Sequence, residues 1–420
     1  MRLFLSVIVA ISLMAASWQP VLADTGRDVL DESGNVLIRN VTKEDIPRLI
    51  DYYCNGGYVG NQAGSYLSEF GRDAVSALLE AMGRHTAPSK IIPMLTQTKD
   101  PSVIPPISKL LIGNQEEKSY AQAALVNFGD AAAPYLLQMV KDNAYFKAAT
   151  DTLKSTEPTA VTRAALRGML DSKDQNERAG AYDVLGFWRD DYIAAPFAKT
   201  VVSDTDFVRE AAFTGYIACF VQTPEKFDTV LMVGLLKDPD PAIRADAALV
   251  LMNRPYPPAY VTLVSMLKTE KDARVREFVV SALAELKDDR AVLPFIEIVR
   301  DGGEKYGAKA NAVYGLRLLK AKEAIPYITA LVDKGQADEK ILKDVCECLK
   351  EIGEPVDLGP FLKYLNNTYS CDTMVELMAL IDTNAKAGDK RLVDALVDYR
   401  DHAKGCSMPE QANGILARIK

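Results

Sequence analysis

Apolar positions along the chain follow the spacing of amphipathic helices, and the whole pattern recurs about every 32 residues. Each copy has a basic anchor residue, a smaller residue three positions later and a large apolar residue four positions after that. These offsets put the two side chains on one helical face, where the smaller one lets a neighbouring helix approach and the larger one fills the gap. The clearest anchors are Arg178, Arg209, Arg244, Arg276 and Lys309, followed by Ala181, Ala212, Ala247, Val279 and Ala312, and then by Leu185, Tyr216, Leu251, Leu283 and Leu316.

Prolines keep the same register as the anchors. Pro196 and Pro294 each lie 18 residues after an anchor, Arg178 and Arg276 respectively. Proline is tolerated in the first turn of a helix because its missing N–H would be unpaired there. Each proline therefore predicts the start of the other helix of a unit. The prolines that precede an apolar segment in this way are Pro106, Pro134, Pro196, Pro294, Pro326 and Pro360.

A repeated helix–turn–helix unit predicts an all-α fold, a right-handed α-solenoid of about 12 helical repeats. We assign residues 46–353 to the solenoid and residues 354–420 to degenerate carboxyl-terminal repeats or a cap. Weaker copies of the repeat continue the pattern toward both ends of the chain. Their anchors lie near Gly60, Pro88, Lys118, Phe146, Leu342, Thr373 and Pro409.

The segment Leu235–Ala248 resembles the core of a HEAT repeat of the short type named after phycobilisome lyases, and Arg274–Glu277 repeats its centre. In that family an Asp in the inter-helix turn and an Arg at the start of the second helix stack from unit to unit as a polar ladder. A turn carboxylate can accept from the free N–H groups of the next helix, and a guanidinium offers it a fork of donors. Lys309 departs from this pattern. The resemblance implies a structural ladder of Asp206, Asp240, Arg209, Arg244 and Arg276.

The first residues predict an export signal. Arg2 supplies a positive start, Leu3–Ala16 is an uncharged apolar run, and Val21–Ala23 is a small-residue cleavage site. The run is too short to span a bilayer. We therefore expect residues 1–23 to be removed, leaving an exported chain from Asp24, periplasmic or secreted, without a membrane span.

Residues 24–45 lie ahead of the repeats. Val29–Ile38 has apolar ends around a turn-forming centre, which predicts a small hairpin or an extended arm. Because the terminal units of a repeat array must cover an exposed apolar face, we interpret this non-helical arm as a cap, with partner binding by the arm as the alternative.

The charge balance and the rarity of histidine exclude several functions. A formal charge of -8 argues against a nucleic-acid-binding face. Only His85 and His402 are available for histidine chemistry, and no hydrolase, metalloprotease, Walker or dinucleotide motif occurs. The HEAT-type deoxyhypusine hydroxylase holds iron with His-Glu pairs, whereas Thr86 and Ala403 follow the two histidines here. We therefore assign no catalytic residue, metal ligand or cofactor.

Six cysteines follow the signal, and an exported chain meets oxidising surroundings. Cys346 and Cys348 lie two residues apart on a predicted helix and point to different sides, and the spacing lacks zinc knuckles. Cys371 and Cys406 precede predicted helices in equivalent turns of neighbouring units. We predict a disulfide between these two residues.

The exposed surface is the remaining candidate for a functional site, because a solenoid exposes a continuous face made by one helix of every unit. We predict a non-catalytic scaffold of the periplasm or cell envelope that binds a protein partner along that face. An ordinary solvated face, an enzyme subunit or maturation factor related to HEAT-type lyases, and an envelope polysaccharide-binding or assembly protein remain alternatives. The candidate partner-binding residues are Asp183, Asp246, Glu277, Ser281, Asn311 and Tyr314.

Overall fold

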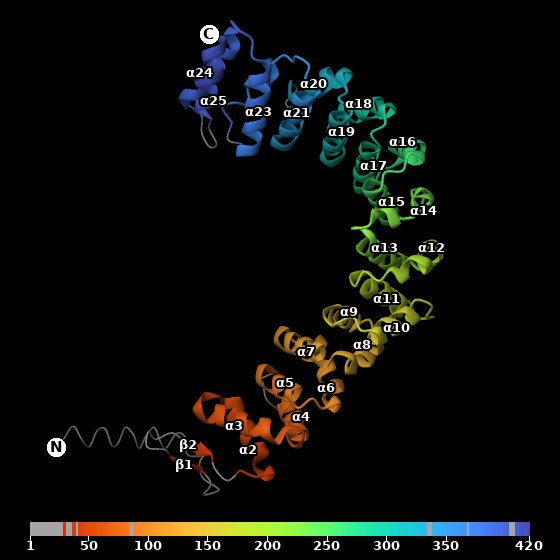
Figure 1. The fold of residues 1–420 in the computed structure, drawn as a ribbon, viewed down its shortest axis with the longest axis vertical. Coiled ribbons are helices and arrows are strands. Elements are labelled where there is room, and N and C mark those ends of the chain that lie inside the picture. Colours follow the sequence, from red (N-terminus) through yellow and green to blue (C-terminus); the bar gives the residue numbers. More distant parts are fainter. Residues whose placement is uncertain are drawn as a thin grey trace, which may run out of the picture. The chain divides into compact units, whose positions relative to one another are not determined.

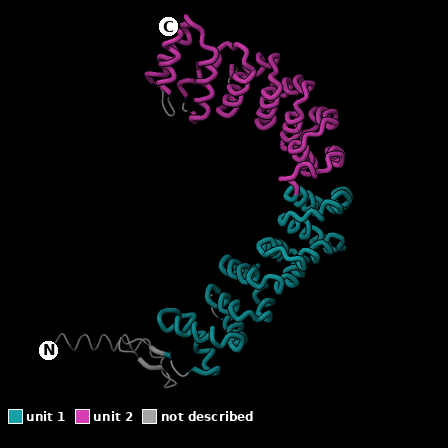
Figure 2. The backbone as a smooth tube through the Cα atoms, in the orientation of Figure 1, with its two compact units in different colours: residues 1–219 teal, residues 220–420 magenta. Residues whose placement is uncertain are grey.

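The computed structural model describes residues 28–30, 36–38, 41–84, 88–333, 338–367, 369–402 and 408–420. The expected signal peptide, 1–23, lies outside the described residues, as do His85 and Cys406. The chain forms two compact units, Met1–Cys219 and Phe220–Lys420 (Figure 2). We describe each unit by itself.

Unit 1 is a stack of helix pairs (Figure 1). Even-numbered helices form one layer and odd-numbered helices the other, and α3, α5, α7, α9 and α11 each contact the next helix of their row. In chain order, with η for 3-10 helices, its elements are β1 (Asp28–Leu30), β2 (Val36–Ile38), η1 (Lys43–Asp45), α2 (Ile46–Asn55), α3 (Gly57–Phe70), η2 (Gly71–Ala74), α4 (Val75–Arg84), α5 (Pro88–Gln97), η3 (Pro101–Val103), α6 (Ile104–Ser108), η4 (Lys109–Ile112), α7 (Gln115–Phe128), η5 (Gly129–Ala131), α8 (Ala133–Met139), α9 (Phe146–Ser155), α10 (Ala160–Met169), α11 (Gln175–Phe187), η6 (Asp191–Ile193), α12 (Ala194–Ser203) and α13 (Asp206–Phe220), whose last residue already belongs to unit 2.

Unit 2 repeats this arrangement. Its odd-numbered helices contact one another in sequence from α15 to α25, and α14, α16, α18, α20 and α24 each pack on the odd-numbered helix that follows. Its elements are η7 (Pro224–Lys226), α14 (Thr229–Leu235), α15 (Pro241–Asn253), η8 (Pro257–Ala259), α16 (Tyr260–Thr269), α17 (Ala273–Leu286), η9 (Asp289–Ala291), α18 (Val292–Arg300), α19 (Tyr306–Leu318), η10 (Lys322–Ala324), α20 (Ile325–Asp333), α21 (Glu339–Ile352), α22 (Gly359–Leu362), α23 (Cys371–Asn384), α24 (Lys390–His402) and α25 (Pro409–Ile419).

The all-α solenoid expected from the repeat is confirmed. Every anchor, strong or weak, lies on an odd-numbered helix from α3 to α25. The apolar residues three and seven positions after the five strong anchors are all buried, because they face the even-numbered helix and the neighbouring odd-numbered helices. All six register prolines lie in the first turn of an even-numbered helix, as their missing N–H requires.

The odd-numbered helices α11 and α13 of unit 1 approach each other through two glycines. A Cβ atom on Gly186 would lie 2.3 Å from the Cα of Gly215, and one on Gly215 would lie 2.4 Å from the carbonyl oxygen of Tyr182. No side chain fits at such distances. The two glycines therefore set the separation of these helices in unit 1.

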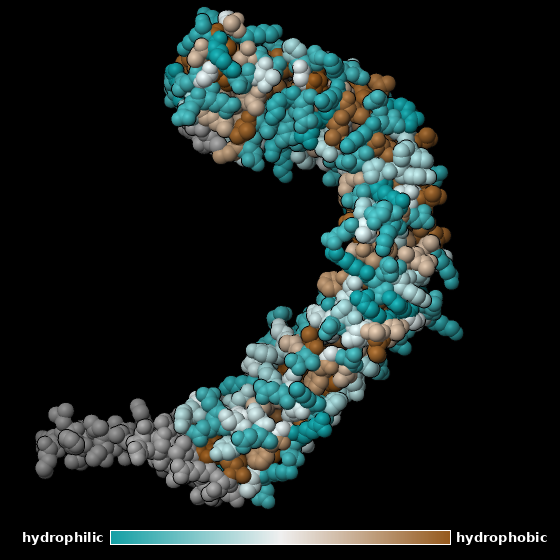
Figure 3. Space-filling model, in the orientation of Figure 1, coloured by the Kyte–Doolittle hydropathy of each residue, from teal (hydrophilic) through white to brown (hydrophobic). Residues whose placement is uncertain are grey.

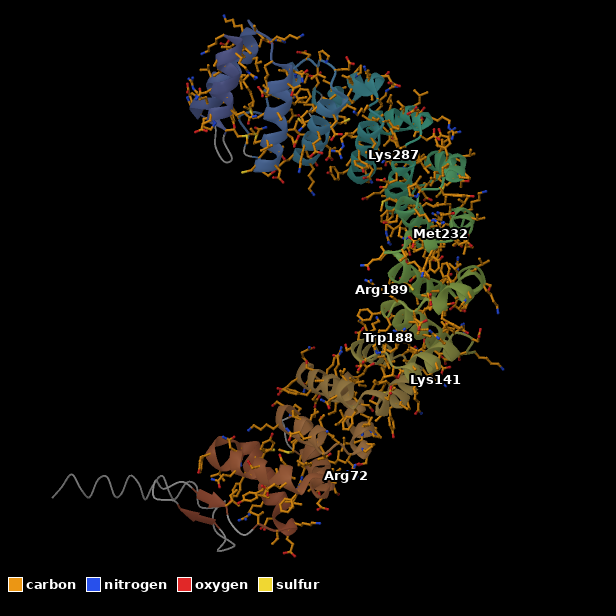
Figure 4. All side chains as sticks on the ribbon, in the orientation of Figure 1. Arg72, Lys141, Trp188, Arg189, Met232 and Lys287 are labelled. Carbon is orange, nitrogen blue, oxygen red and sulfur yellow. The ribbon has the colours of Figure 1, made fainter. Side chains whose placement is uncertain are left out.

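Several odd-numbered helices are followed by a residue with left-handed backbone. Gly71 and Gly129 follow α3 and α7 with φ of 51° and 53°. A left-handed residue closes the last turn of a helix, and a positive charge is favourable beside its terminal carbonyl groups. Gly353 follows α21 with φ of 76°, whereas basic residues follow α5, α11, α17 and α19, namely Lys99, Arg189, Lys287 and Lys320. Figure 4 labels Arg189 and Lys287.

The amino-terminal arm contains a hairpin, one of the two forms expected for it. Strands β1 and β2 pair antiparallel, with Val29 opposite Leu37. The backbone N–H of Ile38 donates to Oε1 of Gln62 at 3.3 Å, and the Tyr66 hydroxyl donates to the carbonyl of Ile38 at 3.1 Å. These bonds attach β2 to α3, the position that a cap would occupy. Within the described part of the chain, no helix has the length and apolar character needed to cross a bilayer.

Candidate functional site

Arg244 lies near the start of α15 and reaches into the next repeat. Its Nε and Nη2 donate to the two carboxylate oxygens of Glu270, at 2.7 and 3.0 Å, and its Nη1 donates to the carbonyls of Asp238 and Pro239, each at 2.9 Å. Burial by itself would raise the pKa of Glu270, but the hydrogen bonds and charge of Arg244, together with the backbone N–H groups of Asp272 and Lys271, hold that pKa below its ordinary value. The pair is a bidentate, charge-assisted link between repeats.

Two other anchor arginines make the same contact. Arg276 of α17 binds Glu304, with its Nε at 3.2 and 3.1 Å from the carboxylate oxygens and its Nη2 also donating. In unit 1, Arg178 of α11 binds Asp204, at 2.7 Å from Nε and 2.6 Å from Nη2. The ladder therefore runs from an anchor arginine to a carboxylate just ahead of the next odd-numbered helix.

The acidic residues predicted for the ladder take only part of the expected role, because neither links one repeat to the next. Asp240 instead caps α15, where its carboxylate accepts from the N–H of Ala242 at 2.9 Å. Asp206 lies 3.2 Å from Nη1 of Arg209 three residues later on the same helix, and its side chain is 81% exposed. For Asp240 the physical reason is proximity: an Asp immediately before a helix lies beside the free N–H groups of that helix. The guanidinium of Arg244 therefore binds a carboxylate of the next repeat, that of Glu270.

The pairing carboxylates have a signal in the sequence that we missed. Asp204, Glu270 and Glu304 lie five, six and five residues before the anchors Arg209, Arg276 and Lys309. The spacing follows from geometry, because the turn that ends each even-numbered helix has to lie beside the start of the preceding odd-numbered one. An acidic residue at this offset, rather than the Asp at the helix start, predicts the partner of the anchor arginine.

Two of the expected partner-binding residues, Asp246 and Asn311, connect α15, α17 and α19. Asp246 of α15 pairs with Nη2 of Arg274 at 3.3 Å. The Asn311 side chain donates to the carbonyl of Glu277 at 3.2 Å, and the Ser281 hydroxyl donates to the same carbonyl at 2.9 Å. These polar positions chosen from the sequence therefore lie on one surface of unit 2, and Asp246 and Asn311 join its helices.

The surface continues toward α21 through the candidate Tyr314 and through residues that the sequence did not single out. The Tyr314 hydroxyl donates to Oε1 of Glu285 at 3.1 Å. The guanidinium of Arg317 lies 5.0 Å from the Tyr314 ring centroid and pairs with Glu347 of α21. We call the non-core side chains of α15, α17, α19, α21 and α23, apart from the anchor residues, the odd-helix face of unit 2.

Asp183, the remaining candidate, lies on α11 in unit 1. Its carboxylate is 2.6 Å from Nζ of Lys154 on α9. It makes the same kind of link between neighbouring helices as Asp246 does, but within the other unit.

Carboxylates outnumber basic groups on the odd-helix face. Burial, followed by the charge of Glu347, raises the pKa of the Asp344 carboxyl. Burial and the charges of Asp344 and Asp338 raise the pKa of Tyr306 to about 12. In both cases neighbouring negative charge adds to the effect of burial. The carboxylates are Asp246, Glu277, Glu285, Glu339, Asp344, Glu347, Glu351, Asp372, Glu376 and Asp382, and the basic side chains are Arg274, Arg317, Lys340, Lys343 and Lys350.

The groups considered for chemistry are dispersed among the described residues. No three His, Cys, Asp or Glu side chains in this part of the chain are placed to hold one metal ion. His402 is exposed at the end of α24, with its Nδ1 at 3.0 Å from Oδ1 of Asp398. Cys346 and Cys348 are buried free thiols of α21. Cys371 begins α23, and its pairing with Cys406 stays a prediction because Cys406 lies outside the described residues.

Comparisons with known proteins identify the repeat in part of the chain. Residues 229–308, which run from α14 into α19, match the family described as HEAT repeats. A structure of human deoxyhypusine hydroxylase in complex with glycerol is 16% identical, with 62% of this chain and 98% of that chain covered and a TM-score of 0.28. A crystal structure of importin beta in an ammonium sulfate condition is 12% identical, with 90% of this chain and 69% of that chain covered and a TM-score of 0.45. No curated protein matches the chain.

Proposed function

We propose that this chain is an exported, non-catalytic scaffold that binds a basic segment of a protein partner on the odd-helix face of unit 2. Solenoids of helical repeats present extended surfaces of this kind, and such surfaces typically bind proteins. The proposal also includes removal of residues 1–23 and a disulfide between Cys371 and Cys406. The apolar run and the small-residue site at the amino terminus support export.

The observation that carries the binding proposal is the surplus of carboxylates on neighbouring helices. Many acidic groups of the face already have partners within the protein, as Asp246 has Arg274 and Glu347 has Arg317. Glu277, in contrast, is exposed and projects from α17 toward the start of α19, where a Cβ on Gly307 would lie 2.3 Å from its carboxylate. With the crowded Asp344 it gives the face a negative potential that favours a cationic partner and speeds its association.

The side chains of the odd-helix face are linked from one helix to the next. The links between α15, α17, α19 and α21 hold long side chains in place before a partner arrives, so less side-chain entropy is lost on binding. Such a surface fits an extended or helical segment that crosses several repeats.

The test uses the chain from Asp24 as bait in native extract of the exported compartment, with bound proteins and small molecules identified by mass spectrometry. We expect a saturable protein partner whose retention falls at least about tenfold when Glu277→Lys and Asp372→Lys are combined, and falls with added salt. Both carboxylates are exposed on the face.

The matched control combines Asp289→Lys and Glu323→Lys, which change the net charge equally at exposed positions on η9 and η10. The control should retain the partner. Equal loss in both variants would show a general charge effect and contradict the assigned face. Recovery of a stoichiometric small molecule without any protein partner would contradict the scaffold function itself.

A further inference from the structure

Two hollows open between the even-numbered helices of unit 2, on the layer other than the odd-helix face. The first groove, of about 630 Å³, lies between the end of α14 and α16 and has Leu236 and Met266 in its lining. The second groove, of about 230 Å³, lies between α16 and α18 and has Leu267 and Ile298 in its lining. Each has a ladder arginine in its lining, Arg244 or Arg276, whose charge is met by its own glutamate.

The second groove lies at the same place in its repeat as the first groove does in the preceding repeat. Six lining positions of the first groove reappear in the second after a shift of 32 residues, so both have the same construction. The corresponding pairs are Leu236 and Lys268, Arg244 and Arg276, Thr262 and Pro294, Ser265 and Glu297, Met266 and Ile298, and Thr269 and Asp301.

An exposed apolar side chain stands at the same place on each helix. Val261, second residue of α16, is 71% exposed and lines the first groove. Leu293, second residue of α18, is 69% exposed and directly precedes Pro294 of the second groove. In Figure 3, hydrophobic residues lie among hydrophilic ones over these even-numbered helices. Each of these side chains offers apolar surface that an occupant of the neighbouring groove can bury.

The two grooves differ in charge. The first has the exposed Lys237 and Lys271 in its lining, and these are its charges beyond the Arg244–Glu270 pair. The second has the exposed Glu297 and Asp301, against one exposed lysine, Lys268. An occupant that covers both grooves is therefore complementary when it carries a negative group at the first and a positive group at the second.

We propose that these grooves bind one extended polypeptide segment, with an apolar side chain in each groove, an acidic residue beside Lys237 and Lys271, and a basic residue beside Glu297 and Asp301. Packed helices lie about 8–10 Å apart, and an extended segment in the polyproline II conformation has three residues per turn and advances about 3.1 Å per residue. Every third side chain of such a segment lies on the same side and thus meets the next groove. This site is separate from the odd-helix face and does not depend on the function proposed for that face.

The test is fluorescence anisotropy of the chain from Asp24 with a labelled peptide of sequence Glu-Leu-Ser-Ser-Leu-Lys. We expect saturable binding that Val261→Asp weakens at least about tenfold, because a carboxylate replaces the apolar contact. The matched control is Val161→Asp, since Val161 is the second residue of α10 in unit 1 and is also 71% exposed. Both substitutions are at exposed sites, and equal melting temperatures would show that both variants fold.

The charge arrangement is tested with the swapped peptide Lys-Leu-Ser-Ser-Leu-Glu and with Lys271→Glu. The wild-type chain should prefer the first peptide, and Lys271→Glu should reduce that preference. Absence of saturable binding up to about 1 mM peptide, equal affinity for both peptides, or equal effects of Val261→Asp and Val161→Asp would each overturn the proposal. Sedimentation that shows self-association abolished by Val261→Asp would also overturn it, in favour of a second copy of the chain as the occupant.

Discussion

The guanidinium of Arg244 and the carboxylate of Glu270 form two parallel hydrogen bonds across one repeat of unit 2, at 2.7 and 3.0 Å. The glutamate side chain is 8% exposed and the arginine side chain 18% exposed, so water competes little for either group. The pair ties the start of α15 to the turn before α17. Its neighbour Arg276–Glu304 does the same one repeat later.

Replacing Glu270 with glutamine should destabilise unit 2. The amide keeps the shape of the side chain but leaves the half-buried Arg244 without its counter-charge, which we expect to lower the free energy of unfolding by about 1–3 kcal/mol. Urea denaturation followed by circular dichroism measures the effect. Asp289→Asn, at an exposed site on η9, is the control. A Glu270→Gln change no larger than that of the control would contradict the structural importance of the ladder.

The effect of Glu270→Gln should depend on pH. Because the folded-state pKa of Glu270 is lowered, its carboxylate stabilises the fold above the ordinary carboxyl pKa, and this stabilisation is lost as the pH falls through the folded-state pKa. The difference in stability between wild type and Glu270→Gln should therefore be largest near neutral pH. This difference should disappear at pH values well below the ordinary glutamate pKa of about 4. A difference that stays constant between these conditions would rule out the charge as its cause.

The core of the fold could be predicted from the sequence because burial in a repeat array follows one periodic pattern. Ala247 and Leu251 are buried where the register placed them, and the same offsets hold at Val279 and Leu283. The anchor pattern located only the arginine side of the ladder. Its carboxylates sit in turns of unequal length and are Asp at one repeat and Glu at others, so the anchor period alone does not locate them.

The candidate surface could be predicted in part, for a different reason. The sequence identified which side of each odd-numbered helix faces away from the core, and so it found Asp246, Glu277 and Asn311. The stagger of neighbouring helices determines which of their side chains come into contact. No single residue in the sequence indicates this stagger. Glu285 and Arg317 were missed for this reason, although they make the same kind of contact.

The close approach of α11 and α13 predicts opposite effects for two glycine substitutions. Gly215→Ala should lower the free energy of unfolding by about 1–3 kcal/mol, because its Cβ would lie 2.4 Å from the carbonyl oxygen of Tyr182 and the helices would have to separate. Gly234→Ala, in α14 with nothing within 4 Å of the new atom, should raise it by about 0.5–1 kcal/mol through helix propensity. Melting temperatures that move in the same direction would refute the close-contact explanation.

Asp344 should behave oppositely to Glu270. Its folded-state pKa is raised by burial and by Glu347, so its charged form is disfavoured in the fold at neutral pH. Asp344→Asn should therefore raise the melting temperature at pH 7, and the gain should disappear below about pH 4, where the unfolded chain is protonated as well. Asp372→Asn, at an exposed site on α23, should show little change at either pH. A lower melting temperature for Asp344→Asn at pH 7 would contradict the crowding of charge on the odd-helix face.

The proposed disulfide would close a loop of 35 residues, because Cys371 begins α23 and Cys406 lies in the sequence between α24 and α25. In the chain-entropy description, closing a loop of this length stabilises the fold by about 4 kcal/mol. Reduction should therefore lower the melting temperature of the carboxyl-terminal repeats, and Cys371→Ser should remove that response. A non-reduced digest of the exported protein checks the bond directly, since the two cysteines should appear in one cross-linked species. Recovery of both as free thiols would disprove the bond, whereas retained Cys346 and Cys348 thiols are expected because these buried thiols lie inside α21.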